Sequence, residues 1–249
     1  MDVGAARRIA AACDPASLPN ALEVGAGTGA LTRALLDAGA RVRALEIDPE
    51  LVAILRERED LGAAEVIQTD ALAYDYASAY GDQPWCATGN LPYNVATPLL
   101  LQWIGLASPP RRIVVMVQRD VADRFTARPG TAAYGSLTLA VGYAMSVRRA
   151  FVLGPESFYP RPKVDSAVVV MERHPVPPVT VADVPFMLQV VRAGFAYRRK
   201  TLANSLALAL DIQRSRVQAA LERLGIDTEI RGEQLDLDAF AALSDELGA

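Results

Sequence analysis

Residues 25–29, Gly-Ala-Gly-Thr-Gly, follow directly on the short apolar run at residues 21–24. A helix-periodic segment comes next at residues 31–38, and Gly39 ends it. A buried strand that enters a glycine loop and continues as a helix is typical of α/β proteins. Further predicted strands alternate with helices along the chain and cover residues 41–47, 65–69, 85–89 and 113–117. We therefore predict an α/β fold with a mostly parallel sheet.

Four residues of the sequence fall at the C-terminal ends of successive predicted strands. They are Gly25, Glu46, Asp70 and Asn90. In an open α/β sheet these strand ends line one crevice, which is where ligands bind. The register of the strands thus predicts a single site that contains all four.

The length of the chain, 249 residues with 51% hydrophobic residues, is enough for one sizeable domain and a smaller one. Residues 174–178, His-Pro-Val-Pro-Pro, have the composition of a linker. Only helical patterns follow, at about residues 182–196, 200–209, 213–224 and 237–247. We expect a catalytic domain over residues 1–174 and a small all-helical domain over residues 175–249.

The formal charge of −4 gives no global basic field, so binding of nucleic acid has to depend on local patches. Two cysteines and one histidine do not support a disulfide scaffold or a zinc cluster, and we expect no metal. No apolar run has the length of a membrane span, and the first residues lack the apolar core of a signal peptide. We expect a cytoplasmic protein with no membrane partner.

The glycine loop by itself leaves two cofactor classes open. Gly25-x-Gly27-x-x-Ala30, with Glu46 about twenty residues later, also fits the fingerprint of nicotinamide-dependent oxidoreductases. In either class the Glu46 carboxylate can accept hydrogen bonds from ribose hydroxyls; its alternative role is that of a solvated strand end that caps the next helix.

Residues near the other strand ends favour S-adenosylmethionine. Asp70 is placed to accept from an adenine amino group, with the Ala71 N–H beside it as a donor, although Asp70 is equally suited to cap a helix. Glu23, next to the glycine loop, is able to attract the ammonium group of a methionine moiety or to serve only as a strand-end residue.

The Asn90-Leu91-Pro92-Tyr93 turn predicts an acceptor site for a methyl group. The Asn90 side-chain carbonyl and the Leu91 backbone carbonyl, held by Pro92, can accept both hydrogens of an exocyclic amine. The nitrogen lone pair is then drawn out of conjugation and can attack an electrophilic methyl, whereas hydride transfer has no use for such a turn. Tyr93 offers a stacking face for a base. An ordinary turn with Tyr93 over the core is the alternative.

Two further segments are candidates for contacts with a nucleic acid. The stiff loop 158–166 carries Phe158, either a second stacking plane or simple core, and the basic residues Arg161 and Lys163. Arg198, Arg199 and Lys200 adjoin Arg192 in a net acidic chain, which favours phosphate contacts over a merely solvated charged face.

Taken together, these segments resemble the ribosomal RNA adenine N6,N6-dimethyltransferase family, specifically its bacterial small-subunit members. The resemblance rests on Leu-Glu-Val-Gly-Ala-Gly-Thr-Gly-Ala-Leu-Thr at 22–32, Glu-Ile-Asp at 46–48, Asp-Ala at 70–71, Asn-Leu-Pro-Tyr-Asn at 90–94, Phe-x-Pro-x-Pro-Lys-Val-x-Ser at 158–166 and Arg-Arg-Lys-Thr-Leu-x-Asn at 198–204. It implies a Rossmann-like S-adenosylmethionine-dependent methyltransferase sheet with a small C-terminal all-helical domain. It also implies that Gly25, Gly27, Glu46, Asp70 and Asn90 hold the cofactor.

The resemblance further implies a substrate. Two adjacent adenosines in the 3′-terminal hairpin loop of 16S rRNA are each methylated twice, in a pre-assembled small subunit, and we expect the enzyme to be a monomer. Two alternatives remain: a large-subunit rRNA methyltransferase of the macrolide-resistance type, and an assembly factor with weak methylation. Family members usually begin with a basic segment and a Gln-Asn-Phe-Leu-x-Asp motif that folds over the cofactor. Here Asp2 matches only the last residue of that motif. A truncated sequence, a misassigned start and a true loss of the lid are the three explanations.

Overall fold

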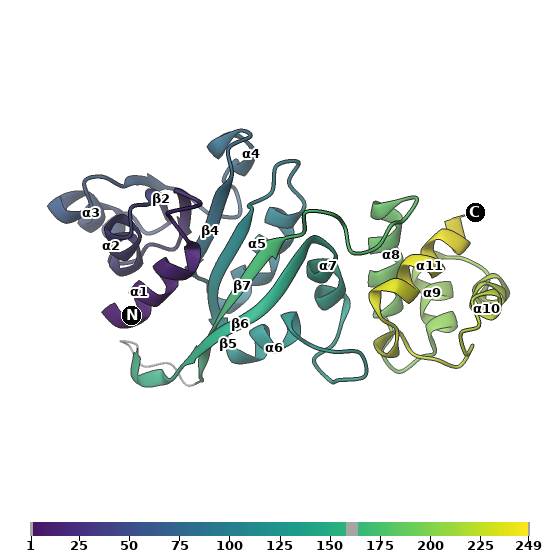
Figure 1. Ribbon diagram of the computed structural model, residues 1–249. Helices are drawn as coiled ribbons and strands as arrows, with labels where there is room; N and C mark the ends of the chain where they lie inside the picture. The colour runs from purple at the N-terminus through teal and green to yellow at the C-terminus, as the bar shows by residue number, and fades with distance from the viewer. Residues whose placement is uncertain (1, 158–163, 249) are drawn as a thin grey trace. The chain divides into compact units, whose positions relative to one another are not determined.

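A computed structural model describes residues 2–157 and 164–248, without the side chain of Tyr93 (Figure 1). The chain divides into two compact units, Met1–Ala122 with Met145–Arg173, and Asp123–Ala144 with His174–Ala249. The first unit is built on a seven-stranded sheet and the second consists of helices, and each is described by itself below.

The sheet has the strand order β3-β2-β1-β4-β5-β7-β6. Its five parallel strands are β1 (Asn20–Val24), β2 (Arg41–Glu46), β3 (Glu65–Gln68), β4 (Trp85–Asn90) and β5 (Arg112–Gln118). The antiparallel strands β7 (Ser166–Arg173) and β6 (Met145–Leu153) complete it. The predicted α/β fold is therefore confirmed. The strand order changes direction between β1 and β4, which is the position where such sheets bind ligands.

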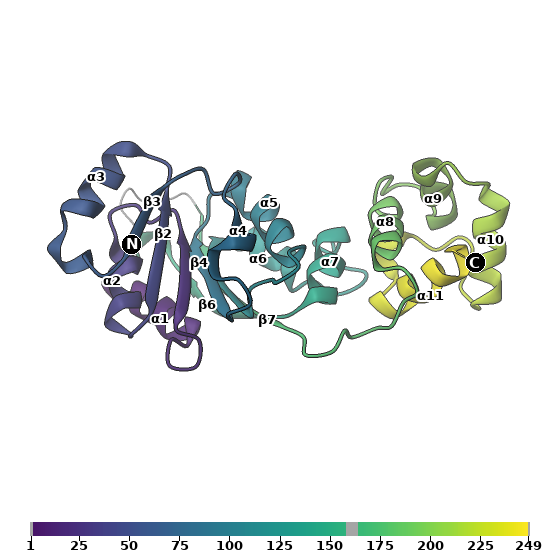
Figure 2. The same cartoon turned by 90° about the horizontal axis from the view of Figure 1, so that it is seen from above.

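Helices cover both faces of this sheet. They are α1 (Val3–Cys13), α2 (Ala30–Asp37), α3 (Pro49–Glu57), α4 (Tyr76–Tyr80), α5 (Tyr93–Ile104) and α6 (Arg119–Phe125), with a 3-10 turn η1 (Glu59–Leu61). Val114 and Met116 of β5 join α1 and α2 in one core cluster. Because side chains alternate along a strand, the buried Ile113 and Val115 point to the opposite face. Figures 1 and 2 show α1 and α2 on one face and α5 on the other.

The β1 and β4 strands approach each other closely at Gly89. A Cβ atom there would collide with the backbone carbonyl of Val24. Next to it, the buried Thr88 hydroxyl donates a 2.7 Å hydrogen bond to the Val114 carbonyl. Glycine at position 89 thus lets β4 lie against β1 and deliver its last residue, Asn90, to the end of the sheet.

The helical unit contains α7 (Ser136–Ala144), α8 (Val184–Gly194), α9 (Leu202–Leu210), α10 (Arg214–Arg223), η3 (Gly232–Gln234) and α11 (Leu237–Gly248). The last four α-helices correspond to the segments expected from periodicity. Residues 123–144, which the sequence placed with the sheet, group with the helices instead. The reason is Tyr134, which is buried, packs edge-on against Phe195 and donates a 2.8 Å hydrogen bond to the Leu235 carbonyl.

Candidate active site

The glycine loop folds over the C-terminal ends of β1 and β2. Its three glycines all have positive φ angles: Gly25 (+73°), Gly27 (+58°) and Gly29 (+84°). The N–H groups of Gly25 and Ala26 donate to the Leu45 carbonyl at 2.9 and 3.3 Å. A Cβ atom on Gly25 would lie 3.9 Å from the backbone oxygen of Asn90. The loop and the Asn90 turn, predicted to share one crevice, are therefore neighbours.

Glu46 is buried at the end of β2, with 6% of its surface exposed. Its Oε2 accepts from the Gly27 N–H at 2.8 Å, and its Oε1 accepts from the N–H groups of Ile47 and Asp48 at 2.9 and 3.1 Å. The helix cap of α3 is Asp48, which accepts from the Glu50 N–H, so Glu46 is neither solvated nor a cap. A carboxylate oxygen accepts two hydrogen bonds, and Oε2 retains capacity for a ligand hydroxyl.

Glu23 lies beneath the loop with 1% of its surface exposed. The Thr32 hydroxyl donates a 2.6 Å hydrogen bond to its Oε2. Burial is the main reason that the pKa of Glu23 is raised to about 8; the Thr32 hydrogen bond opposes this shift, and the nearby Glu46 adds to it. Near neutral pH the carboxyl is therefore mostly protonated unless a cation binds beside it.

Asp70 is exposed just after β3, and its Oδ1 accepts from the Leu72 N–H at 2.9 Å in a local turn. The backbone of this turn is anchored from behind, because the Tyr76 hydroxyl donates a 2.8 Å hydrogen bond to the Ala71 carbonyl. The Tyr76 ring in turn stacks on Trp85 at 6.3 Å between centroids. The second carboxylate oxygen of Asp70 has no partner among the described residues, which leaves an acceptor at the strand ends.

Ile47 and Leu72 are two large apolar residues that sequence reasoning missed. Ile47 is 63% exposed and Leu72 is 41% exposed. They follow the ends of adjacent strands, since Glu46 pairs with Gln68 and the Thr69 N–H donates to the Glu46 carbonyl. The sequence signal for such a pair is an apolar residue one or two positions after an acidic residue at a predicted strand end, where exposed residues are usually polar.

The Asn90 turn begins in register with the sheet. Asn90 is exposed and pairs with Met116 of β5, and the Leu91 N–H still donates to the Met116 carbonyl at 3.0 Å. Pro92, with φ −59° and ψ 149°, then starts α5 without any side-chain cap. Among the described residues, none donates a hydrogen bond to the Asn90 side chain or to the Leu91 carbonyl. Asn90 thus does not cap α5.

Several predicted residues lie outside the described part of the structure. These are the Tyr93 side chain, Phe158, Arg161 and Lys163. The described residues on either side of segment 158–163 are anchored. The Asp2 N–H donates to the Ser157 carbonyl at 2.9 Å, and the Arg119 N–H donates to the Asp165 carbonyl at 3.0 Å. Arg119 directly follows the C-terminal end of β5, so Asp165 lies at the same end of the sheet as Asn90.

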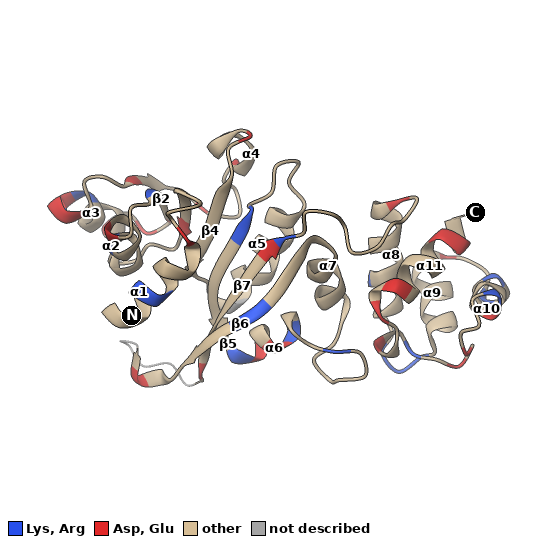
Figure 3. Ribbon diagram, in the orientation of Figure 1, with Lys and Arg blue, Asp and Glu red and all other residues tan. Residues whose placement is uncertain are grey.

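The three basic residues of the helical unit differ in their surroundings. Arg198 donates to the Ala132 carbonyl at 3.2 Å and pairs with Glu233 at 3.3 Å. Arg199 and Lys200 are exposed and form no ion pair with any residue that the structure describes. Figure 3 shows Lys and Arg in short separate stretches of the chain.

Neither a metal site nor a membrane-spanning helix occurs among the residues that the structure describes. Residues 2–157 and 164–248 contain no group of three or more His, Cys, Asp or Glu side chains placed to hold a metal ion. Among the same residues no helix has the length and apolar character needed to cross a membrane.

Comparisons with solved structures agree with this arrangement. A dimethyladenosine transferase from Plasmodium falciparum superimposes with a TM-score of 0.81 at 25% identity, covering 96% of this chain and 94% of that chain. The 23S rRNA methyltransferase ErmE superimposes with a TM-score of 0.75, also at 25% identity, covering 100% of this chain and 99% of that chain.

Sequence relatives are more similar still. Proteins named ribosomal RNA small subunit methyltransferase A are 41% identical in Streptococcus pneumoniae strain P1031, over 92% of this chain and 82% of the relative. The relative of the same name in Hahella chejuensis is 39% identical, over 98% of this chain and 88% of the relative. Residues 2–248 match the family described as ribosomal RNA adenine dimethylase. The resemblance drawn from the motifs is thus confirmed, and this chain belongs to the ribosomal RNA adenine dimethylase family.

Proposed function

We propose that this protein transfers methyl groups from S-adenosylmethionine to adenine N6 in small-subunit rRNA. Its substrate is the pair of adjacent adenosines in the 3′-terminal hairpin loop of 16S rRNA, each dimethylated during assembly of the subunit. The observation that carries this function is the exposed residue Asn90, whose backbone oxygen lies next to Gly25. No described residue donates a hydrogen bond to its side-chain carbonyl or to the Leu91 carbonyl. The relatives named small subunit methyltransferase A support the choice of substrate.

The residues at the strand ends fit S-adenosylmethionine. Gly25 lies next to the Asn90 backbone, a Cβ atom on Gly27 would meet nothing within 4 Å, and Glu46 would accept from ribose hydroxyls. Asp70 and the Ala71 N–H would bind the adenine edge, while the exposed Ile47 and Leu72 side chains would pack on its faces. Once bound, this cofactor supplies an electrophilic methyl on a sulfonium centre.

Glu23 would act on the charged end of the same cofactor. An ammonium group close to Glu23 favours the ionised carboxylate, so binding would shift its raised pKa downward and release a proton. Cofactor affinity is then expected to increase as the pH approaches 8.

The Asn90 turn would activate the target amine. The side-chain carbonyl of Asn90 and the backbone carbonyl of Leu91 accept its two hydrogens, which draws the nitrogen lone pair out of the ring. Pro92 keeps the Leu91 carbonyl in place, and Tyr93 and Phe158 are proposed to stack on the adenine. No side chain needs to act as a base, because the alkylated nitrogen is acidic enough to lose its proton to water. In the second transfer one hydrogen remains, and one carbonyl suffices.

Contacts with rRNA are proposed for basic residues in both units. They are Arg161, Lys163, Arg198, Arg199 and Lys200. Of these, Arg199 and Lys200 are exposed, as phosphate contacts require. The protein would act as a monomer on the small subunit in the cytoplasm, where ribosomes assemble.

The large-subunit alternative shares the fold, since ErmE superimposes over the whole chain. It is less favoured because identity to ErmE is 25%, against 41% for the small-subunit relative. The assembly-factor alternative differs in its dependence on Asn90, because binding to the subunit would not require the carboxamide.

Primer extension on unmethylated small subunits tests the proposal. Wild type with S-adenosylmethionine should yield dimethyladenosine at the two hairpin positions and none on large-subunit RNA. Asn90→Ala should lower kcat by about 100-fold or more, as for other polarising hydrogen-bond groups, while a pull-down still recovers the subunit. Gln102→Ala, a carboxamide in α5 away from the strand ends, should be unaffected. Activity of Asn90→Ala within about threefold of wild type would refute the acceptor role.

A further inference from the structure

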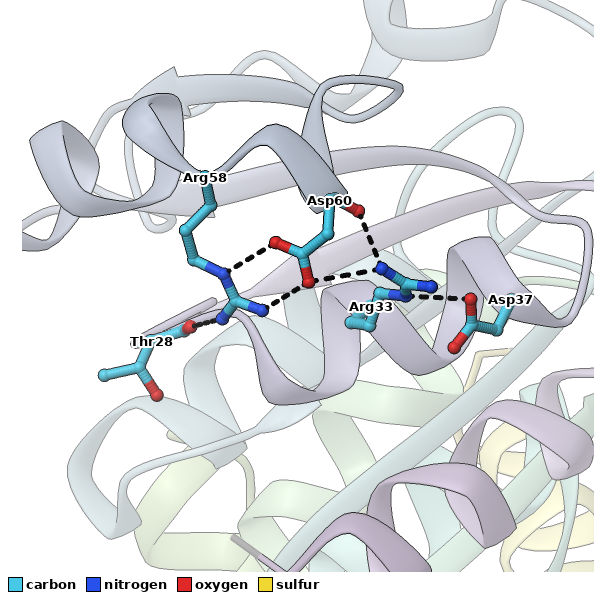
Figure 4. A network of polar contacts seen from close by, with 5 residues as sticks. All are labelled: Thr28, Arg33, Asp37, Arg58 and Asp60. Carbon is cyan, nitrogen blue, oxygen red and sulfur yellow. Dashed lines mark hydrogen bonds and ion pairs between the residues drawn. The ribbon is translucent and has the colours of Figure 1, made fainter.

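Next to the glycine loop, five residues from the loop, α2, η1 and the residue that joins α3 to η1 form a chain of polar contacts (Figure 4). They are Thr28, Arg33, Asp37, Arg58 and Asp60. The Nη1 of Arg58 donates a 2.5 Å hydrogen bond to the backbone carbonyl of Thr28. Its Nε and Nη2 donate to the two carboxylate oxygens of Asp60 at 3.0 and 2.7 Å. One guanidinium thus joins the loop backbone to an acid on η1.

Asp60 is itself held in place by α2. The Nη1 of Arg33 lies 3.2 Å from Oδ2 of Asp60, and its Nε donates to Asp37 at 2.8 Å. The Arg33 side chain is therefore part of the same network without bonding the loop; only its backbone N–H, which a substitution retains, donates to the Gly29 carbonyl at 3.0 Å. All these ion-pair side chains are between 35% and 46% exposed, and exposed pairs of this kind add only about 0–1 kcal/mol to stability. The network contributes little to the folding of the unit as a whole.

A second contact, made by apolar side chains, joins the glycine loop to α3 and η1. A Cβ atom on Gly29 would lie 2.5 Å from Cδ1 of Leu61 and 2.9 Å from Cδ2 of Leu55. The end of the loop therefore rests directly on α3 and η1. On the other side, the Gly27 N–H is bound by Glu46. The loop is held between a carboxylate in front and Arg58 behind.

We propose that Arg58 is a positioning residue for the glycine loop. A loop with three glycines at positive φ has many accessible conformations unless its backbone is bound. Arg58 binds the Thr28 carbonyl while Asp60 orients its planar fork, so the loop is kept in the conformation in which its backbone meets the ligand. Lysine has a single donor group and cannot hold both partners in this geometry. That the ligand is S-adenosylmethionine rests on the proposed function.

Three variants test the proposal: Arg58→Met, Arg58→Lys and, as the matched control, Arg33→Met. Hydrogen exchange of the cofactor-free protein should be faster by about fivefold or more at residues 25–30 in Arg58→Met. Calorimetry should show the Kd for S-adenosylmethionine raised by about 5–20-fold, with kcat at saturating cofactor within about twofold of wild type. Arg58→Lys should be intermediate, and Arg33→Met should stay within about twofold in every measurement.

The two hypotheses fail in different ways. If wild type does not bind S-adenosylmethionine, the proposed function is wrong, while hydrogen exchange in the loop still tests the role of Arg58. If exchange at residues 25–30 and the Kd are both unchanged in Arg58→Met, Arg58 does not position the loop. Faster exchange spread over the whole sheet, with a large drop in Tm, would show a general structural role and would equally overturn the proposal.

Discussion

Thr32 of α2 donates a 2.6 Å hydrogen bond to the carboxyl of Glu23 in β1, and both side chains are buried. Burial raises the pKa of Glu23 to about 8 from 4.5, against the smaller opposing effect of that hydrogen bond. The folded protein therefore keeps a proton that the unfolded chain has already released between these two pH values.

The free energy of unfolding should depend on pH through Glu23. Because its folded pKa is raised, its contribution is fully present below pH 4.5 and is lost as the pH rises to about 8, at up to about 1.4 kcal/mol per pH unit. Glu23→Gln removes this dependence. The free energy of unfolding can be measured with urea for both proteins at pH 5 and pH 8.5. Between these pH values, wild type should lose a few kcal/mol more of this free energy than the variant does. Parallel pH profiles would contradict a buried, protonated Glu23.

Gly89→Ala should disrupt the contact between β1 and β4. The added methyl collides with the Val24 carbonyl, which is backbone and cannot move aside, so we expect a loss of about 3 kcal/mol or failure to fold. Gly142→Ala is the control, because a Cβ atom there meets nothing within 4 Å inside α7. That variant should gain up to about 1 kcal/mol in chemical denaturation. Equal stability of the two variants would argue against the close approach.

Tyr76→Phe should loosen the turn at Ala71. Losing its hydroxyl leaves the Ala71 carbonyl unpaired, at a cost of about 1–2 kcal/mol, and should raise the Kd for S-adenosylmethionine several-fold. Tyr80→Phe is a matched control, because that hydroxyl donates to the Ala21 carbonyl near the opposite end of β1. It should lose similar stability in denaturation without any change in calorimetric Kd. A parallel change in Kd would show that the effect is not local to the turn.

Arg199→Ala and Arg198→Ala should differ in RNA binding. Arg199 is exposed and has no ion pair among the described residues. Its removal should therefore weaken RNA binding and reduce the slope of log K against log salt concentration by about one. Arg198 already holds Glu233 and the Ala132 carbonyl, so its removal should act mainly on the stability of the helical unit. Filter binding to small-subunit RNA at several salt concentrations compares them, and identical slopes would reject the distinction.

Much of the sheet and of the site was predictable from local patterns. Apolar runs and the glycine loop mark where strands end, and these local patterns are enough to predict Gly25, Glu46, Asp70 and Asn90 at one edge of the sheet. Parallel strands deliver such residues to the same crevice whatever the details of packing. The motif of the Asn90 turn likewise depends on neighbouring residues alone.

The α/β alternation and the set of residues at the strand ends thus follow from local sequence, since both depend on neighbours along the chain. Whether each of these groups is neutral, hydrogen-bonded or exposed depends instead on how distant parts of the chain pack together. Glu23 is protonated because it is buried. Tyr134 belongs to the helical unit because it bonds Leu235, which is 101 residues away in the chain. The Thr28 carbonyl is bound by Arg58, which is 30 residues away. Such contacts arise from long-range packing, for which residue spacing carries no signal.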